Sequence, residues 1–153
     1  MITENLIKEE ILPYFGFRGH VHLFEGPSTD DYPAASPVEI IQTDQSFHLR
    51  FHWRTNGNLN YIMCGTWKCR IYLEQMGGGE FTLNPAYALG KEDFVAKPNL
   101  YECSIDVPAN QVKAGVYRVV ATLTLEGETG VPAPVAAFAD LGIVQFYSDG
   151  PAS

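Results

Sequence analysis

The sequence has little of what catalytic and cofactor centres are usually built from. Its 153 residues include 4 histidines and 3 cysteines, and only 18% are charged. It contains no Gly-x-Ser-x-Gly elbow, no Gly-x-x-x-x-Gly-Lys phosphate loop and no Gly-x-Gly-x-x-Gly fingerprint. We therefore expect no catalytic residue and no cofactor, and we predict that the protein is not an enzyme.

Long apolar runs and export signals are also missing. Even the apolar stretch 135–147 contains Asp140 and Gln145, so no segment approaches the length of a membrane span. The N-terminus mixes glutamates with apolar residues and has no basic region before them, unlike a secretory leader. The cysteine count is odd and there is no Asn-x-Ser/Thr sequon, so nothing requires an oxidising compartment. We expect a cytoplasmic protein, and a secreted one only if a leader has been removed.

The charge that is present is mostly negative. The formal net charge is -8 and the pI is near 4.8, so the chain as a whole repels nucleic acid and anionic lipid. We expect no nucleic-acid partner and no membrane insertion. Hydrophobic residues make up 46% of the chain, which is typical of a globular protein with a packed core.

Alternating hydrophobicity is the strongest pattern in the sequence. From Ser46 to Arg54, apolar residues alternate with histidine and arginine, which predicts a half-buried strand with a basic polar face. Further strands are predicted at 17–24, 38–43, 61–74, 81–83, 100–107, 114–125 and 135–147. Seven or eight strands at this spacing favour an all-β, antiparallel two-sheet sandwich.

A short helix is predicted before these strands. Thr3 can cap it, Leu6, Ile7 and Ile11 fall at helical spacing, and Pro13 ends it. We therefore divide the chain into an N-terminal helical segment at 1–16, a β-sandwich domain at 17–148 and a tail at 149–153. Residues 26–37 are predicted to form an acidic, proline-rich loop, and residues 84–99 an irregular excursion.

One corner of the predicted sandwich carries a fold-level resemblance. Val107-Pro108, a short loop and Ala114-Gly115-Val116-Tyr117 resemble the E-to-F corner of immunoglobulin-like and fibronectin-type-III-like sandwiches. The resemblance covers residues 38–147. It implies that the Tyr117 hydroxyl bonds back to the corner and that Trp67 is the strand-C tryptophan. It implies no antibody-like disulfide, because the corresponding positions hold Leu49 or Phe51 and Val119.

Basic residues on outward-facing positions form the first candidate binding surface. Lys68, Arg70 and Tyr72 lie on one predicted strand, and Arg118 lies on another. The immunoglobulin-like resemblance implies that these strands are neighbours, so the four side chains would share a sheet face. Such a face could bind an acidic partner. The alternative is a solvated face with cross-strand ion pairs, such as one between Arg70 and a nearby acid.

The last predicted strand is apolar on both faces. A terminal strand of a sandwich normally has one wet face, so a second apolar face indicates cover by other residues. Leu141, Val144 and Phe146 therefore form the second candidate binding surface, for a protein partner or another subunit. Cover by the excursion at 84–99 is the alternative.

Histidines and cysteines offer metal or redox chemistry. His20 and His22 share one strand face, and His48 and His52 share another, so the four could converge on zinc. Arg50 would repel a cation there, so we predict no metal site and keep the four histidines as the alternative. Cys69 and Cys103 both fall on inward positions, and we expect structural thiols; a disulfide between the sheets is the alternative for an exported protein.

The patterns favour a non-catalytic protein-interaction or assembly module that binds a protein partner or forms a homo-oligomer. A carbohydrate- or small-ligand-binding sandwich is one alternative, with aromatic platforms at Tyr32, Tyr61, Tyr72 and Tyr87. The other alternative is a metal-dependent enzyme built on the four histidines.

Overall fold

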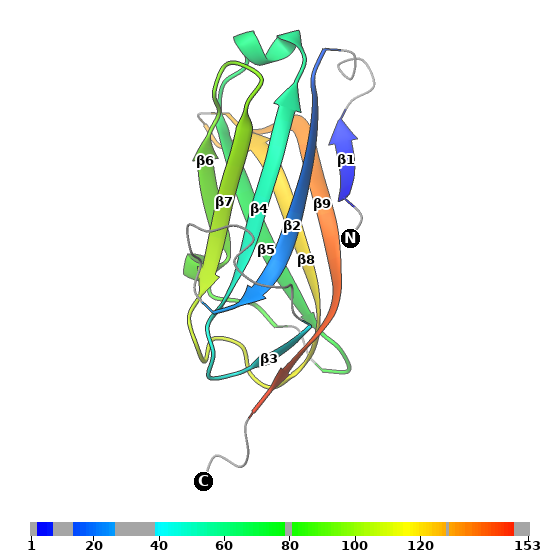
Figure 1. The fold of residues 1–153 in the computed structure, drawn as a ribbon, viewed down its shortest axis with the longest axis vertical. Helices are drawn as coiled ribbons and strands as arrows, with labels where there is room; N and C mark the ends of the chain where they lie inside the picture. The colour runs from blue at the N-terminus through cyan, green and yellow to red at the C-terminus, as the bar shows by residue number, and fades with distance from the viewer. Residues whose placement is uncertain (1–2, 8–13, 27–38, 79–80, 128, 149–153) are drawn as a thin grey trace.

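Two β-sheets face one another in a computed structural model of the chain (Figure 1). The structure describes residues 3–7, 14–26, 39–78, 81–127 and 129–148. Its strands are β1 (Thr3–Ile7), β2 (Gly16–Glu25), β3 (Ile40–Gln42), β4 (Phe47–Asn56), β5 (Thr66–Gln75), β6 (Leu89–Asp93), β7 (Leu100–Val107), β8 (Gly115–Glu126) and β9 (Pro132–Tyr147). Two 3-10 turns, η1 (Asn58–Ile62) and η2 (Pro85–Tyr87), complete the described elements. None of the helices in these ranges is long and apolar enough to cross a membrane.

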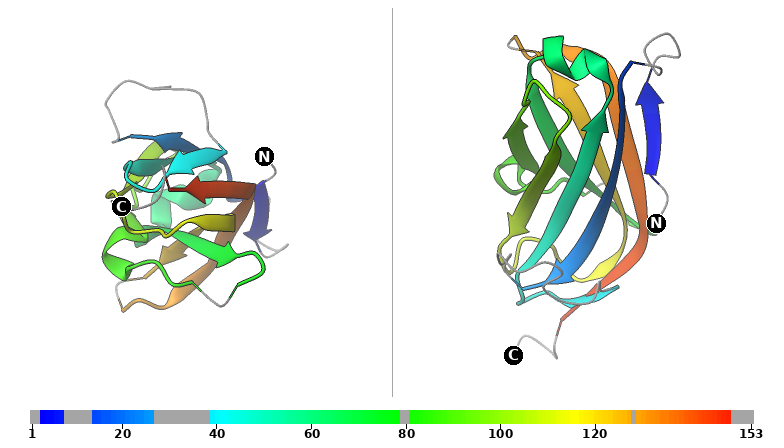
Figure 2. Two further views of the ribbon diagram at one scale, coloured as in Figure 1. Left: turned by 90° about the horizontal axis from the view of Figure 1, so that it is seen from below. Right: turned by 45° about the horizontal axis from the view of Figure 1, so that its top comes forward.

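The strand order is that of a sandwich. A 6-stranded sheet runs β1-β9-β8-β5-β6, with β3 also paired to β9, and a 3-stranded sheet runs β2-β4-β7. Figure 2 shows the two layers from one end. The all-β, two-sheet prediction is confirmed. The orders β2-β4-β7 and β9-β8-β5-β6 correspond to strands A-B-E and G-F-C-C′ of immunoglobulin-like sandwiches. One pair departs from the antiparallel prediction, because β3 runs parallel to β9.

Inward-facing aromatic side chains fill one end of the core. Trp67 of β5 is fully buried, and its ring centroid lies 5.6 Å from that of Phe17 and 5.7 Å from that of Trp53. Phe94 and Tyr101 complete the cluster at 6.0 and 5.8 Å from Trp67. The centroid separations are those of favourable tilted and edge-to-face pairs. The cluster therefore joins both sheets around the tryptophan.

The Tyr117 corner has the contact that the immunoglobulin-like resemblance implies. Tyr117 is fully buried near the start of β8, and its hydroxyl donates a hydrogen bond of 2.8 Å to the backbone oxygen of Lys113. Its ring also packs edge-on against Phe146 at 5.5 Å. The corner is thereby tied to the core by a polar contact as well as by packing.

Replacing Tyr117 with phenylalanine isolates the polar contact. The ring and its packing stay, while the Lys113 carbonyl loses its donor, so we expect Tyr117→Phe to lower the free energy of unfolding by about 1–2 kcal/mol. Urea denaturation followed by fluorescence measures this difference. Tyr72→Phe, on the exposed face of β5, is the matched control, and an equal loss in both variants would contradict the corner's role.

The predicted N-terminal helix is wrong. Residues Thr3–Ile7 form β1, which pairs antiparallel with β9 from Thr3 opposite Ala139 to Ile7 opposite Val135. An isolated helix of this length is marginal in water, whereas the edge of β9 supplies a ready row of backbone partners. Residues 8–13, the remainder of the predicted helix, lie outside the described residues.

The apolar second face of β9 has a local cause. A bulge at Leu141 shifts the pairing, so that Val119 opposes Gly142 while Val120 opposes Asp140. Gly142 has a φ of 83°, and its N–H bonds the Asp140 carboxylate at 2.8 Å. One extra residue reverses which positions face inward. Ala137 and Ala139 point into the core before the bulge, and even-numbered residues do so after it.

The bulge corrects the second candidate surface. Val144 and Phe146 are 1% and 2% exposed, and both belong to the core cluster. Leu141 is partly buried against the same core. These side chains cannot form an exposed docking face. The sequence-based prediction placed them outward because it assumed a strand without a bulge. The exposed positions in this part of β9 are Ile143, Gln145 and Tyr147.

Candidate functional site

The outer face of the three-stranded sheet carries a group of polar side chains. Strand pairing sets them in rows across β2, β4 and β7. Arg18 opposes Arg54, and His22 opposes Arg50. His20 opposes His52, which in turn opposes Glu102 on β7. We call this set the histidine face; its members are Arg18, His20, His22, Arg50, His52, Arg54 and Glu102.

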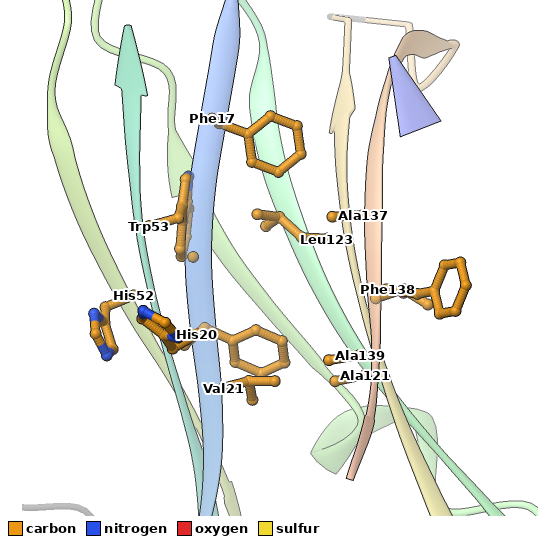
Figure 3. A pocket seen from close by; sticks show the side chains of 13 residues that line it. Phe17, His20, Val21, His52, Trp53, Ala121, Leu123, Ala137, Phe138 and Ala139 are labelled. Carbon is orange, nitrogen blue, oxygen red and sulfur yellow. The ribbon is translucent and has the colours of Figure 1, made fainter. Parts of the chain in front are cut away.

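Three imidazoles gather on the histidine face. The ring centroids of His20 and His52 are 5.4 Å apart, and His22 lies 6.3 Å from His20 and 6.5 Å from His52. Figure 3 shows His20 and His52 together on one side of β2 and β4, while Phe17 and Val21 point to the other side, into the core. Period-two alternation produces this division, since even positions of both strands point outward.

His48 does not join the other histidines. It lies opposite Phe24, two rows from His52, and the two rings stack at 5.2 Å. Its side chain is 1% exposed, and Nδ1 lies 2.8 Å from the backbone oxygen of Gly26. The four histidines proposed as metal ligands are therefore three clustered imidazoles and one that is held separately.

Two arginines at one end of the histidine face have no carboxylate partner in the part of the chain that the structure describes. Arg18 and Arg54 are both exposed and directly opposed, an arrangement of like charges that costs stability. With His20, His52 and Glu102 they line a depression of about 760 Å³. The unfavourable pair therefore places two cationic forks at a concave surface.

Glu102 is the acidic member of the face, and it is already engaged. Arg50 is 4% exposed, and its Nε lies 2.8 Å from Oε1 of Glu102, an ion pair by distance that lacks hydrogen-bond alignment. The carboxylate thus balances the buried guanidinium rather than Arg18 or Arg54. Because this pair is partly buried, the imidazoles beside it lie in an environment of lower dielectric constant than water.

Two imidazoles on the face resist protonation. Burial lowers the pKa of His22 below the ordinary 6.5, and charge on His52 and His20 lowers it further. Burial likewise lowers the pKa of His52, with His20 and Arg50 adding to the effect and Glu102 opposing it. Both rings are therefore neutral near pH 7 and become cationic only in a more acidic solution.

The chemistry of the face favours binding of an anion. No group of three or more histidine, cysteine, aspartate or glutamate side chains in the described ranges is arranged to hold a metal ion. Apart from Glu102, which pairs with Arg50, the side chains that point outward can donate hydrogen bonds: two guanidinium forks and three imidazoles. Guanidinium groups bind carboxylates and phosphates through paired hydrogen bonds.

The basic residues predicted from the sequence lie on the opposite face of the molecule. Lys68, Arg70 and Tyr72 point outward from β5, and Arg118 points outward from the neighbouring β8. Arg70 contacts Thr124 at 3.1 Å and Glu126 at 3.2 Å, and Arg118 contacts Asp140 at 2.9 Å. Both arginines are thus paired within the sheet. This is the arrangement expected for a solvated face with cross-strand ion pairs, the alternative to a binding surface. Tyr72 is 54% exposed.

The aromatic platforms do not form one surface. Tyr61 is exposed on η1, while Tyr72 is exposed on the outer face of β5. Tyr87 is half-buried against the core, and Tyr32 lies outside the described residues. A stacking site for a sugar needs neighbouring rings on one face, so the three described positions do not assemble one.

A small apolar cavity lies on the core side of the histidine strands. It has a volume of about 30 Å³ and is lined by β2 and β4 on one side and by β8 and β9 on the other (Figure 3). Ala121, Ala137 and Ala139 supply short side chains opposite Val21 and leave this space. The cavity is of water size, far below the volume of a ligand pocket.

Sequence reasoning missed Arg18 and Arg54 as a pair. Arg18, His20 and His22 alternate along one strand in the same way as Arg50, His52 and Arg54 along another, which was the available signal. What could not be read was the register that sets Arg18 against Arg54 and His20 against His52. Register between distant strands depends on long-range packing.

No family model matches the chain, and no curated protein matches it. Solved structures that resemble it include the crystal structure of a CARDB domain from Pyrococcus furiosus in complex with di-metal ions, at 10% identity and a TM-score of 0.46. That comparison covers 90% of this chain and 98% of the other. The solution NMR structure of the same domain is similar at 12% identity and a TM-score of 0.41, covering 88% of this chain and 97% of that one.

Proposed function

We propose that the protein is a non-catalytic interaction module whose histidine face binds an acidic segment of a partner protein. The observation that carries this proposal is the pair Arg18 and Arg54, which have no carboxylate partner among the described residues. They line a depression with His20 and His52, on a chain of net charge -8. A local cationic surface on an acidic molecule steers carboxylates to one place. The like-charge contact is relieved when such a segment binds.

The opposite sheet is the weaker candidate. Its arginines already have acidic neighbours, since Arg118 opposes Glu74 across the strands and contacts Asp140. A partner would have to displace these ion pairs before it gained new ones. Lys68, Arg70, Tyr72 and Arg118 therefore serve as the comparison surface in the test.

Binding is expected to strengthen in acid. The folded pKa values of His22 and His52 are lowered, so below pH 6.5 the unfolded chain takes up protons before the fold does, and the free protein loses stability as the pH falls. A bound carboxylate favours the protonated imidazoles and opposes that loss. Affinity for an acidic segment therefore rises as the pH decreases below 6.5.

A labelled deca-glutamate peptide is a suitable probe. We expect fluorescence anisotropy to show binding that tightens from pH 7.5 to pH 5.5 and weakens with added salt. Arg18→Gln with Arg54→Gln removes both forks without touching the core and should weaken binding about tenfold or more, because each charge-assisted contact contributes about 1 kcal/mol or more.

The control keeps the charge change and moves it to the other sheet. Lys68→Gln with Arg118→Gln removes the same two positive charges and should leave affinity within about twofold. Equal losses of affinity in the two double variants would show that binding depends only on net charge, and would overturn the proposed face. A larger loss in the control pair would move the docking surface to β5 and β8. Light scattering separates a second copy of the chain from a different partner.

A further inference from the structure

Two free thiols meet between the sheets, on the core side of the strand whose outer face carries Glu102. Cys69 lies on β5 of the larger sheet and Cys103 lies on β7 of the smaller one, and both are buried and unbridged. Both sit on the inward alternation of their strands. The third cysteine, Cys64, is exposed in the segment before β5.

Gly90 of β6 shows how close the two sulfurs are. It is the direct cross-strand partner of Cys69, so a side chain there would lie roughly 5 Å from the Cys69 Cβ. A Cβ built on Gly90 would fall 2.5 Å from the Cys103 Sγ. The Cys103 sulfur therefore occupies the space that a side chain at Gly90 would take, immediately beside Cys69.

The thiols are also chemically unequal. The Cys69 S–H donates a hydrogen bond to the Cys103 sulfur, which lowers the pKa of Cys103 and raises that of Cys69. Burial raises the pKa of Cys69 further, and Glu92 acts in the same direction on both sulfurs, while Arg70 opposes it at Cys69. Cys103 is thus the sulfur better able to attack a disulfide.

We propose that Cys69 and Cys103 form a redox site, at which a small-molecule disulfide such as oxidised glutathione converts the two thiols into a disulfide between the sheets. The Cys103 thiolate attacks one sulfur of the oxidant, breaks its S–S bond and releases one thiolate. Cys69, having given up its proton, then attacks the sulfur of Cys103 and releases the second thiolate. Two protein thiols are oxidised, and one small disulfide is reduced to two thiols.

The position gives the bond a structural effect. β5 and β7 belong to different sheets, and no backbone hydrogen bonds join these two strands in the described pairing. A covalent link between them closes the chain from 69 to 103 and restricts the unfolded state. The oxidised protein should therefore resist unfolding more strongly than the reduced one, and a reductant should reverse the change.

The test uses the full chain with Cys64→Ser, so that only the buried pair reports. After refolding in a glutathione redox buffer, we expect intact mass to show loss of two hydrogens and a non-reducing digest to join the peptides of Cys69 and Cys103. Thermal unfolding should shift upward by about 5 °C or more and return to the reduced value with dithiothreitol.

Two further arms keep the outcome decisive. In Cys103→Ser with Cys64→Ser, Cys69 has no partner, so the expected result is no internal bond and no upward shift after the same treatment. Native protein that keeps two free thiols after refolding in the redox buffer would overturn the proposal. A stable glutathione adduct without the internal bond would overturn it as well.

Discussion

Trp67→Ala is expected to lower the free energy of unfolding by about 3–5 kcal/mol, the largest effect among the substitutions considered. Trp67, on the larger sheet, is fully buried. Its ring centroid lies within 6.0 Å of those of three aromatic residues on the smaller sheet and of Phe94, which follows β6. Alanine removes that shared surface and leaves a cavity that rigid neighbouring strands cannot fill. Thermal and urea unfolding followed by circular dichroism measure the loss.

Two companion variants separate packing from other causes. Tyr72→Ala removes an exposed ring from the same strand and should cost less than about 1 kcal/mol. Trp67→Phe keeps most of the packing and removes an indole N–H that has no hydrogen-bond acceptor in the described part of the chain, so its cost should fall well below that of alanine. Equal losses for Trp67→Ala and Tyr72→Ala would show that the cluster does not hold the sheets together.

Gly19→Ala is the second substitution with a large expected effect, and it connects stability with binding. A Cβ at Gly19 would lie 2.7 Å from the Cβ of Trp53 and 2.8 Å from the backbone oxygen of His52. Neither atom can move without shifting β4, so we expect a loss of about 1–3 kcal/mol. The same shift moves His20 from His52, and affinity for the deca-glutamate peptide should fall.

Gly127→Ala is the matched control for this substitution. Its Cβ would meet the Val131 backbone oxygen at 3.8 Å, an ordinary contact. Denaturation and peptide anisotropy should both stay close to those of the unmodified protein. If Gly19→Ala also left stability and peptide affinity unchanged, the prediction would be wrong. β2 and β4 could then move apart more easily than their close pairing indicates.

The fold was predicted well where local sequence patterns alone determine the structure. The alternation at 46–54 and 100–107 became β4 and β7, and the Tyr117 corner formed its hydrogen bond to Lys113. Prediction failed where long-range pairing decided the outcome. Residues 3–7 have helical spacing but pair with β9, and β6 lies inside the stretch predicted as irregular because β5 offers it a partner. The predicted strand at 81–83 is not among the described strands.

The candidate site was predicted less well than the fold. The histidines were noticed, but only the observed register separates His48 from the other three and sets Arg18 against Arg54. The basic residues at Lys68, Arg70 and Arg118 were placed correctly on one sheet, yet the carboxylates that neutralise the two arginines come from β8 and β9. A sequence shows which residues are charged, while the charge balance of a face depends on strands far apart in the chain.

The bulge at Leu141 also divides into two segments the edge of β9 that faces away from β8. Before it, Val135 to Ala139 pair with β1; after it, Gln145 to Tyr147 pair with β3 running in the opposite sense. Each short strand shields one row of backbone donors and acceptors that would otherwise accept an extended segment from another molecule. Resistance of this sheet to edge-to-edge association therefore depends on two separate pairing strands, of 5 and 3 residues.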